Sequence, residues 1–294
     1  MQIWKYIYGF LTLILVGLII AIFQIPDSNL HIIVCDVGQG DAILITYKNT
    51  QVLTDGGPDQ KVISCLSKYM PFWDREIELV ISTHPDADHS TGLIDVIKRY
   101  NVDKIAISPI DSGTQTIKAL ENAVGGRGVE VLTPVDGMRL GLGMIYLDIV
   151  NPSHNQIGSL SQKVDGSPLG FFKPIDATNE YSISYKLSFG SFSGLFTGDF
   201  GQGVSDRLAL ENKIGSVNYI KVPHHGSRNG LTENLLKQIM PKFAVISVGK
   251  NNRYGHPHKE ILDMLNKYNV KIFRTDEVGD VGLVTDGKNY WIKN

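Results

Sequence analysis

Two series of short apolar runs organise the chain from about residue 27 to its end. Each series begins with runs typical of β-strands and continues with strands that alternate with helical patterns, and no low-complexity linker separates the two. Because a sheet and a helix each bury one face, such a chain is expected to pack two sheets together and to place its helices outside. The pattern therefore predicts one α/β domain over residues 27–294.

The expected elements can be given by residue range. The first series predicts strands in LHIIVCDV, DAILITY and QVLTDGG and over 78–83, and helices over 59–70 and 90–100. The second series predicts strands in MIYLDIV, YSISYKLSF, SGLFTGD, VNYIKVP and FAVISV, helices over 201–211, 230–240 and 258–268, and short strands near 271–274, 281–285 and 289–293. Residues 151–180 show no regular pattern and are predicted to form a surface loop.

The N-terminus carries a longer apolar run of a different kind. Residues 7–25, IYGFLTLILVGLIIAIFQI, hold no charge, and their number is close to the ~20 that a membrane-spanning helix needs. A cleaved signal peptide is the alternative, but AIFQIP is a poor cleavage site, so we expect a retained anchor over residues 1–26. Lys5 precedes the run and Asp27 is the first charge after it. The positive-inside rule then predicts a single-pass protein of the cell membrane with its domain outside the cytoplasm.

Charge and cysteine content exclude several classes of protein. The formal net charge of -2 argues against a globally basic nucleic-acid binder, while leaving room for a local basic patch. Cys35 and Cys65 lie outside any C-x-x-C pattern, which argues against a disulfide scaffold and against a zinc ribbon. Both lie in apolar segments, and we expect buried free thiols.

Metal-capable side chains gather where the strand-like run ELVIST ends. The stretch HPDADH places His84, Asp86, Asp88 and His89 within six residues. A loop between a strand and a helix can bring these side chains around one point, and two imidazoles with two carboxylates suit one or two divalent ions. The alternative is a turn that caps the next helix, with Ser90 as N-cap. Four such groups exceed what capping requires, so the metal site is favoured.

The same chemistry recurs after later strands. Asp199 follows the apolar run LFTG, and a pair of adjacent histidines follows IKVP. Six of the eight histidines lie in three loops that follow strands: His84, His89, His224, His225, His256 and His258. Loops at one edge of a sheet are where sites are assembled, so these residues are expected to meet.

The order of these motifs resembles a known family. His-x-Asp-x-Asp-His, Thr-Gly-Asp and Pro-His-His-Gly-Ser follow one another as in the metallo-β-lactamase superfamily. CDVGQGDAILI, LTDGG, STHPDADHSTG, LFTGD, KVPHHGS and YGHPH are most similar to its ComEC-type branch, which includes the extracellular hydrolase domain of the competence DNA-internalisation protein. The resemblance covers about residues 30–290. It implies a four-layer αβ/βα sandwich with a dinuclear metal site between two sheets.

The resemblance also implies roles for single residues. His84 and Asp86 would bind the first of two divalent ions. Asp88 and His89 would bind the second, together with His225 or alternatively His224. Asp199 would bridge the two ions. Asp55 would orient the metal loop rather than bind metal. Catalytic roles fall to Asp88, Asp199 and His256.

The chain departs from the superfamily pattern at two places. Asp86 replaces the second histidine of the commonest motif, as is common in the ComEC-type branch. The superfamily also usually supplies a histidine ligand between the second and fourth motifs, and His154 in NPSHNQ is the one available. We expect His154 to be an ordinary loop residue, with Asn179 or Ser182 as alternatives in its place. The first ion is then weakly held.

The ligand set predicts a metal preference and a substrate class. Three carboxylates favour harder ions such as Mn²⁺ beside Zn²⁺. They also bring the charge of a two-ion site near zero, so that an anionic phosphodiester can approach. Gln39, in DVGQGD, would line the cleft beside Asp36 and Asp41, or alternatively this segment is a tight glycine turn between two strands. A basic rim for phosphates, or alternatively a solvated loop, is expected from Arg228, Lys250, Arg253 and Lys259, with Tyr254 available for stacking.

These inferences predict a membrane-anchored, extracytoplasmic, metal-dependent hydrolase, namely a phosphodiesterase or nuclease related to competence proteins. A hydrolase of another ester, such as a surface-polymer ester, is one alternative. A non-catalytic metal-binding surface module is another. Competence proteins that this chain resembles also carry a many-helix channel, so a role in DNA uptake would require a separate channel protein.

Overall fold

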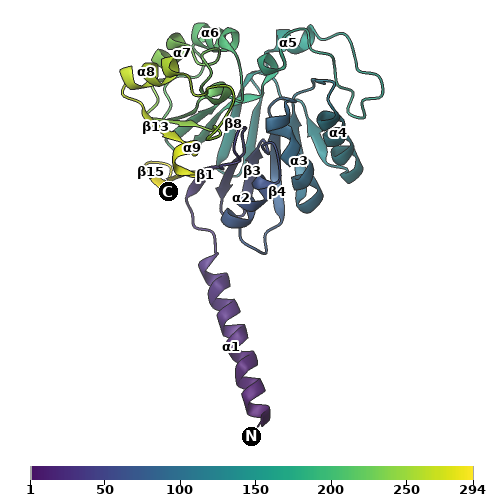
Figure 1. Cartoon of the computed structure of the whole chain (residues 1–294), viewed down its shortest axis with the longest axis vertical. Helices are drawn as coiled ribbons and strands as arrows, with labels where there is room; N and C mark the ends of the chain where they lie inside the picture. The colour runs from purple at the N-terminus through teal and green to yellow at the C-terminus, as the bar shows by residue number, and fades with distance from the viewer. Residues whose placement is uncertain (1, 294) are drawn as a thin grey trace.

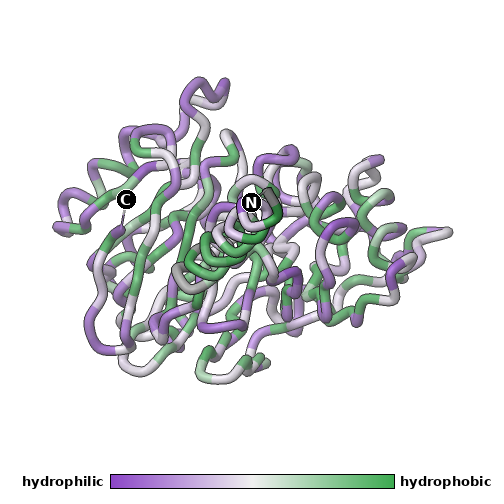
Figure 2. Tube along the Cα trace, turned by 90° about the horizontal axis from the view of Figure 1, so that it is seen from below, coloured by the Kyte–Doolittle hydropathy of each residue, from purple (hydrophilic) through white to green (hydrophobic). Residues whose placement is uncertain are grey.

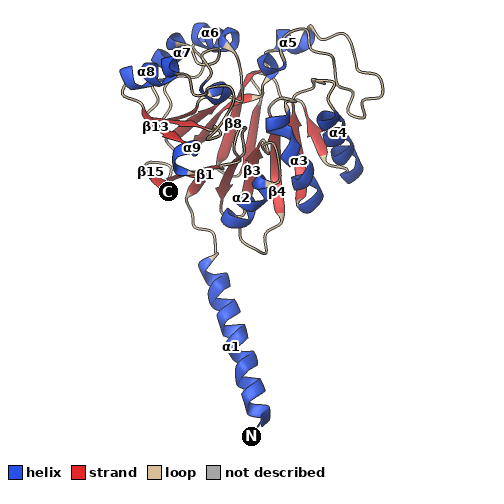
Figure 3. Cartoon of the chain, in the orientation of Figure 1, coloured by secondary structure: helices blue, strands red, loops and turns tan. Residues whose placement is uncertain are grey.

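Two mixed β-sheets face each other in the computed structural model, which describes residues 2–293 (Figure 1). Residues 1 and 294, the outer bounds of the predicted anchor and domain, lie outside the described residues, and residues 2, 20, 22 and 23 are described in their backbone alone. The first sheet has the strand order β15-β14-β1-β2-β3-β4-β5-β6, and the second has the order β13-β12-β11-β10-β9-β8-β7. Figure 3 shows the strands in the middle and the helices on the two outer sides.

The first sheet is built from the first series and the end of the chain. Its strands are β1 (Leu30–Val34), β2 (Ile43–Tyr47), β3 (Thr50–Thr54), β4 (Glu76–Ser82), β5 (Asn101–Ile107), β6 (Glu130–Leu132), β14 (Val281–Thr285) and β15 (Tyr290–Lys293). Strands β3 to β6 run parallel, and the others pair antiparallel. Its outer face is covered by α2 (Lys61–Tyr69), α3 (Ala87–Arg99) and α4 (Gln115–Arg127), whose apolar residues join those of the sheet in one core.

The second sheet repeats this plan. Its strands are β7 (Arg139–Leu142), β8 (Ile145–Asn151), β9 (Ser184–Phe189), β10 (Phe192–Phe196), β11 (Tyr219–Lys221), β12 (Phe243–Ile246) and β13 (Lys271–Arg274). Helices α6 (Gln202–Glu211), α7 (Glu233–Ile239) and α8 (Lys259–Lys267) pack on its outer face. Short helices lie in the connections: α5 (His154–Gly158), α9 (Thr275–Val278) and the 3₁₀ turns Thr178–Tyr181 and Pro223–Gly226.

The alternation of side chains along each strand creates the layers. In β1, Leu30, Ile32 and Val34 enter the core between the sheets, whereas Ile33 enters the core beneath the helices. The core between the sheets also receives Tyr185 from the second sheet. Each sheet thus buries one face against the other sheet and one face under helices. The predicted four-layer αβ/βα sandwich is confirmed.

Two local predictions were wrong, namely the loop over residues 151–180 and the helix start at residue 90, and the elements within residues 101–142 were not predicted. Residues 101–142, for which no element was predicted, form β5, α4, β6 and β7, and residues 151–180 contain α5 and a 3₁₀ turn rather than only a loop. Helix α3 begins at Ala87 with Asp86 in the N-cap position. Ser90 is therefore not the cap but lies inside the first turn, where its hydroxyl donates to the Asp86 carbonyl oxygen.

The expectation of two free thiols was also wrong, because Cys35 and Cys65 form a disulfide. Both residues lie in the core beneath the helices, where the segment after β1 packs against α2 and brings the two Cα atoms to 6.1 Å. This separation suits a disulfide. The two cysteines are 30 residues apart in sequence, and a search for close cysteine spacings cannot detect such a pair.

Helix α1 (Gln2–Phe23) projects from the lower end of the domain (Figure 1). Viewed along the helix from below, its trace is mostly hydrophobic (Figure 2). Large apolar side chains along it, such as Trp4, Phe10 and Leu13, are exposed. Among the residues whose side chains are described, no helix is both long enough and apolar enough to cross a membrane.

Candidate metal centre

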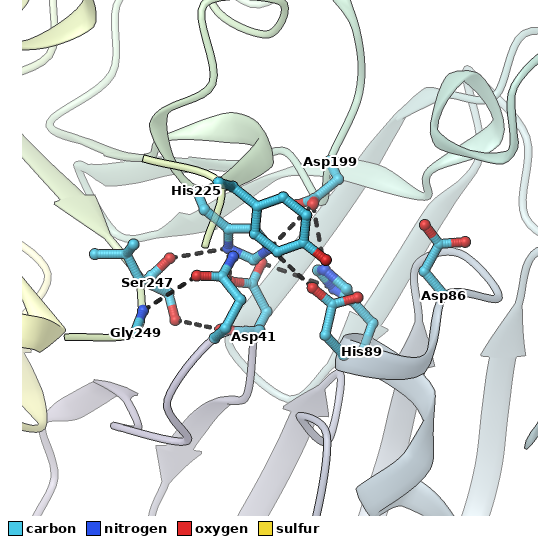
Figure 4. A network of polar contacts seen from close by, with 12 residues as sticks. Asp41, Asp86, His89, Asp199, His225, Ser247 and Gly249 are labelled. Atoms are coloured by element: carbon cyan, nitrogen blue, oxygen red, sulfur yellow. Dashed lines mark hydrogen bonds and ion pairs between the residues drawn. The ribbon is translucent and has the colours of Figure 1, made fainter. Parts of the chain in front are cut away.

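The predicted metal-capable loops meet at one edge of the two sheets. The loop after β4 brings His84 and Asp86, and the first turn of α3 that follows it carries Asp88 and His89. From the second sheet, Asp199 follows β10 and His225 lies in the 3₁₀ turn after β11. Figure 4 shows His89, Asp199 and His225 facing one another, with Asp41 beside them and Asp86 off to one side.

Three buried imidazoles direct their Nε2 atoms into the cluster. The Nε2 atoms of His84, His89 and His225 are buried and make no hydrogen bond to any described residue. Their Nδ1 atoms lie, respectively, 2.9 Å from Thr83 Oγ1, 2.8 Å from Asp55 Oδ2 and 2.9 Å from the Ser247 carbonyl oxygen. Because the Thr83 hydroxyl donates to Asp55, its oxygen accepts from His84, so all three Nδ1 atoms are donors. The three Nε2 lone pairs are then free for a metal, as in metal-binding histidines held by an outer hydrogen bond.

Two carboxylates lie among these nitrogens. Asp199 Oδ2 is 3.3 Å from His89 Nε2 and 3.2 Å from His225 Nε2. Asp88 Oδ2 is 3.4 Å from His225 Nε2. Ligand atoms of His84, His89 and Asp199 lie within 4.8 Å of one another, and so do those of Asp88, His89 and His225. Two adjoining positions for divalent ions therefore fit these donors, with Asp199 between them.

Asp86 and Asp41 stand at the margin of this cluster. Asp86 Oδ2 is 3.7 Å from His84 Nε2, and Asp86 Oδ1 accepts a hydrogen bond from Thr178 Oγ1 at 3.1 Å. Asp86 is thus near enough to join a His84 position after a small movement. Asp41, predicted to line the cleft, is buried deep beside His225, with 3.5 Å from its Oδ1 to the Nδ1 atom of the ring.

The electrostatics of the cluster favour a charged Asp199 and a protonated His225 when no metal is bound. Burial alone would raise the pKa of Asp199, but His225, His89 and Lys221 hold it well below its ordinary value. Burial alone would lower the pKa of His225, but Asp199 and Asp88 raise it to about 9. A metal must displace such a proton before it binds, so its affinity depends on pH. Burial and the neighbouring His89 lower the pKa of His84, which leaves this imidazole neutral.

The structure separates the alternatives left open by the sequence. His225, not His224, points its Nε2 into the cluster. His224 is half-buried, has a φ of 50°, and belongs to no metal-capable group among the described residues. His154 is exposed at the start of α5 and likewise joins no such group. Ser182, one of the two alternatives to His154, lies beside Asp199, and its hydroxyl accepts the Asp199 backbone N–H at 3.2 Å.

His256, the third predicted catalytic residue, lies next to the cluster. Its ring centroid is 6.4 Å from that of His225, and its Nδ1 is buried without a hydrogen-bond partner among the described residues. Burial and the neighbouring His225, His224 and His258 lower the pKa of His256 to about 4. The imidazole is therefore neutral at pH 7. Tyr254 stacks on its outer side with ring centroids 5.7 Å apart.

The predicted substrate-binding residues surround this end of the molecule in different states. Gln39 Oε1 accepts the Gly249 N–H at 3.2 Å, which ties the loop after β1 to the loop after β12. Arg228 is exposed, but its guanidinium is 3.4 Å from Glu260 Oε1. Lys250 and Arg253 are exposed, and the Arg253 guanidinium lies 5.3 Å from the centroid of the Tyr254 ring. A rim of positive charge thus exists, and one of its members is partly neutralised.

Lys221 was missed by sequence reasoning. It ends β11, is fully buried, and contacts Asp41 and Asp199 at the base of the cluster. The signal that could have found it is a lysine inside the apolar run VNYIKVP, since a buried lysine is rare unless it is paired.

A cavity of about 350 Å³ lies elsewhere, between the end of α1 and the first sheet, and Lys48, Gln51 and Lys68 are among its lining residues. No residue of the metal-capable cluster lines it, so it is not the site.

Comparison with known proteins places this fold and cluster in a family. The profile of the metallo-beta-lactamase superfamily matches residues 35–250. The chain is 25% identical over 279 residues to ComE operon protein 3 of Bacillus subtilis, covering 88% of this chain and 34% of that protein. It is 23% identical over 266 residues to competence protein ComA of Neisseria gonorrhoeae, covering 87% and 32%. The chain thus spans about a third of the length of these relatives.

A solved structure supports the assignment of the fold. CmlA, a diiron beta-hydroxylase from Streptomyces venezuelae, superposes with a TM-score of 0.52 at 14% identity, covering 85% of this chain and 53% of that one. At this identity the likeness concerns the fold alone. The profile match extends over more than half of the residues, and the curated relatives include a competence protein, as the motifs predicted. The chain therefore belongs to the metallo-beta-lactamase superfamily.

Proposed function

We propose that this chain is a metal-dependent phosphodiesterase with DNA as its substrate class. The observation that carries the proposal is the convergence of three buried Nε2 atoms, each with its Nδ1 held, on Asp88 and Asp199. This arrangement leaves the three buried Nε2 atoms without a hydrogen-bond partner among the described residues. A fold retains such buried polar atoms when another group satisfies them. Divalent ions are the group that these donors suit.

The residues of the site would have different roles in hydrolysis. When bound, the ions would lower the pKa of a water and stabilise charge on the phosphoryl oxygens. Asp199 would hold the two ions together, and Asp88 with His225 would fix the second. His256, neutral at pH 7 and with a free buried Nδ1, is suited to orient a substrate or water by a hydrogen bond rather than to supply a proton from an imidazolium.

Two observations support DNA as the substrate class. The relatives include a competence protein, and the exposed Lys250 and Arg253 lie shortly before His256 in the chain as candidate contacts to phosphates. Carboxylate-rich ligands favour Mn²⁺ over Zn²⁺ as the activating ion. We also propose a DNA-uptake channel as a partner, because the curated relatives include a competence protein.

A metal-by-substrate screen of the full chain tests the proposal. Single-stranded DNA, double-stranded DNA and bis-p-nitrophenyl phosphate are incubated with Mn²⁺, Zn²⁺ or chelator. Cleavage of DNA and of the small diester with Mn²⁺, and none with chelator, is expected. Cleavage of the small diester alone would indicate another ester as the natural substrate. A chain that binds DNA and cleaves nothing with any metal would favour a binding module and overturn the proposal.

We also propose that α1 anchors the chain in a membrane with the domain outside the cytoplasm. The uncharged run of residues 7–25 and the Cys35–Cys65 disulfide support this, since disulfides persist mainly in oxidising compartments. The test is alkaline extraction of membranes combined with protease treatment of intact cells. Release of the chain by alkali argues against an anchor, and full protection from protease argues against the orientation.

A further inference from the structure

Lys221 carries a charge in the most buried part of the metal centre. Its side chain is fully buried at the end of β11. Its Nζ contacts Asp41 Oδ2, lies 3.4 Å from Asp199 Oδ1, and lies 3.3 Å from the Gly198 carbonyl oxygen. Moving an ammonium ion from water into a protein interior costs a large amount of free energy, so the ion pairs of Lys221 must compensate for this cost. A lysine beside a site for cations therefore requires an explanation.

Asp41, the closest partner of Lys221, also belongs to two metal-capable groups, one with Asp55 and His89 and one with Asp199 and His225, but it faces the Nδ1 atoms of the two histidines. Its carboxylate is 3.5 Å from His225 Nδ1 and 3.9 Å from His89 Nδ1. These Nδ1 atoms already donate to Ser247 and Asp55, on the side opposite the converging Nε2 atoms. The Asp41 backbone is fixed as well, because its N–H donates to the carbonyl oxygen of Asp88 at 3.2 Å. Asp41 and Lys221 thus form a rigid ion pair at the base of the site.

This ion pair divides the two oxygens of Asp199. Oδ1 faces Lys221 at 3.4 Å, whereas Oδ2 faces His89 and His225 at 3.3 and 3.2 Å. We propose that Lys221 is a positioning residue that holds Oδ1 of Asp199, so that Oδ2 alone is presented to the metal ions, with Asp41 as its fixed counter-charge. The inference rests on the proposed metal centre. Lys221 would thus determine which oxygen of the bridging Asp199 binds metal.

The sign of the effect on metal affinity distinguishes this role from that of a mere neighbouring charge. A positive charge close to a cation site repels the cation, so removing it should tighten metal binding if charge alone matters. A positioning residue acts in the opposite direction. Lys221→Met alone mixes the two effects, because it leaves Asp41 unpaired. The double variant Lys221→Met/Asp41→Asn removes one positive and one negative charge, keeps similar side-chain volumes, and therefore isolates positioning.

The experiment is a Mn²⁺ titration of the full chain, with free Mn²⁺ measured by its electron paramagnetic resonance signal. The double variant is expected to bind Mn²⁺ at least tenfold more weakly than the parent. Lys186→Met is the matched control, since Lys186 is a half-buried lysine of β9 that donates to the Ile214 carbonyl oxygen away from the cluster. It is expected to leave Mn²⁺ affinity unchanged. Thermal melting with chelator present shows whether each variant is folded.

A second variant keeps the proposal testable if the first does not fold. Lys221→Gln/Asp41→Asn is also neutral but retains a hydrogen-bond donor for Asp199, and its affinity is expected to lie between those of the parent and the Met/Asn variant. Neutral variants that bind Mn²⁺ as tightly as the parent, or more tightly, overturn the proposal. A parent that binds no divalent ion overturns the metal centre and this inference together. A parent that binds Mn²⁺ without cleaving DNA overturns the proposed activity alone.

Discussion

The two halves of the candidate metal centre differ in how completely the protein has prepared them. On one side Asp88 is joined by His89 and His225, two buried imidazoles whose Nδ1 atoms are held by hydrogen bonds. On the other side the buried His84, which also groups with His89 and the shared Asp199, has Asp86 as its own carboxylate, whose side chain is 41% exposed and whose nearest oxygen is 3.7 Å from His84 Nε2. We call these the complete half and the sparse half.

The difference teaches that the count of metal-capable residues does not determine how well an ion is held. Ligands fixed by outer hydrogen bonds lose little freedom on binding, and those partners commonly change metal affinity by 10–100-fold. Asp86 has an exposed side chain and a single hydroxyl partner, Thr178, from the 3₁₀ turn before β9. We therefore expect the complete half to bind its ion more tightly than the sparse half.

The largest effect is expected where the halves share a ligand. Asp199→Ala removes the carboxylate that faces both positions and leaves two cations without a bridging charge between them. Bound metal should fall by at least one ion per chain, and hydrolysis should fall by about a hundredfold or more, the scale of losing a principal electrostatic element. Metal analysis and bis-p-nitrophenyl phosphate hydrolysis measure both. A variant with full activity and unchanged metal content would show that Asp199 is not shared.

A matched pair of substitutions tests the two halves separately. Asp88→Asn and Asp86→Asn each remove one charge from neighbouring positions of the same loop. Because the complete half holds its ion more tightly, Asp88→Asn should weaken the tightest Mn²⁺ binding step by at least tenfold, and Asp86→Asn should change mainly the weaker step. Two-site Mn²⁺ titrations of both variants provide the measurement. Equal effects on the tight step would remove the distinction between the halves.

The two halves should also respond differently to pH. His225 of the complete half has a pKa of about 9 without metal, so its proton competes with the ion below that pH. Burial alone would lower the pKa of His89 of the same half, but Asp199 and Asp55 raise it well above its ordinary value, so a second proton must also be displaced. Mn²⁺ affinity of the tight step should therefore rise by at least tenfold between pH 7 and 9. His84 of the sparse half has a lowered pKa, so the weak step should lack this dependence.

Thermal stability of the metal-free chain should move in the opposite direction. The raised pKa of His225 contributes stability that is fully present below its unfolded value of 6.5 and is lost as pH rises to about 9. Melting temperature with chelator should therefore decline over this range, while melting temperature with saturating Mn²⁺ should not follow the same decline. A tight step whose Mn²⁺ affinity is flat from pH 7 to 9 would contradict the assignment of His225.

The sequence predicted the metal-capable residues of both halves but not the partners that hold them, for a physical reason. His84, Asp86, Asp88 and His89 share one compact motif, and His225 belongs to an equally recognisable pair, so the order of the motifs locates them. Motif order does not locate the partners of these ligands. Lys221 and Ser247 act through burial and backbone geometry that arise only after the second sheet folds against the first. The Cys35–Cys65 bond was missed for the same reason.

The strands and helices around the site also differ in how well the sequence predicted them. Runs with clear apolar alternation, such as β1 and β9, were predicted close to their true bounds. Strand β6 and strand β7, which have exposed or half-exposed residues throughout, show little such alternation and were missed. Helix α4 was missed although it contributes Leu120 and Val124 to the core, because its glycines and mixed polarity weaken the helical pattern.

The smallest expected effect concerns the residue that could have completed the sparse half. His154 is the one histidine between the second and fourth motifs, yet it is exposed in the first turn of α5 and joins no metal-capable group among the described residues. The helix start is secured by its neighbours instead, since Ser153 and Gln156 form a capping box. Alanine is a strong helix former, so His154→Ala should preserve α5. Mn²⁺ stoichiometry, both binding steps and diester hydrolysis should remain within about twofold of the parent, a range that ordinary surface substitutions occupy. Loss of the weak binding step, or a tenfold loss of hydrolysis, would mean that the loop brings His154 to His84 when metal binds. The sparse half would then gain a ligand beyond His84, Asp86 and the shared Asp199, and the contrast between the two halves would disappear in the metal-bound protein.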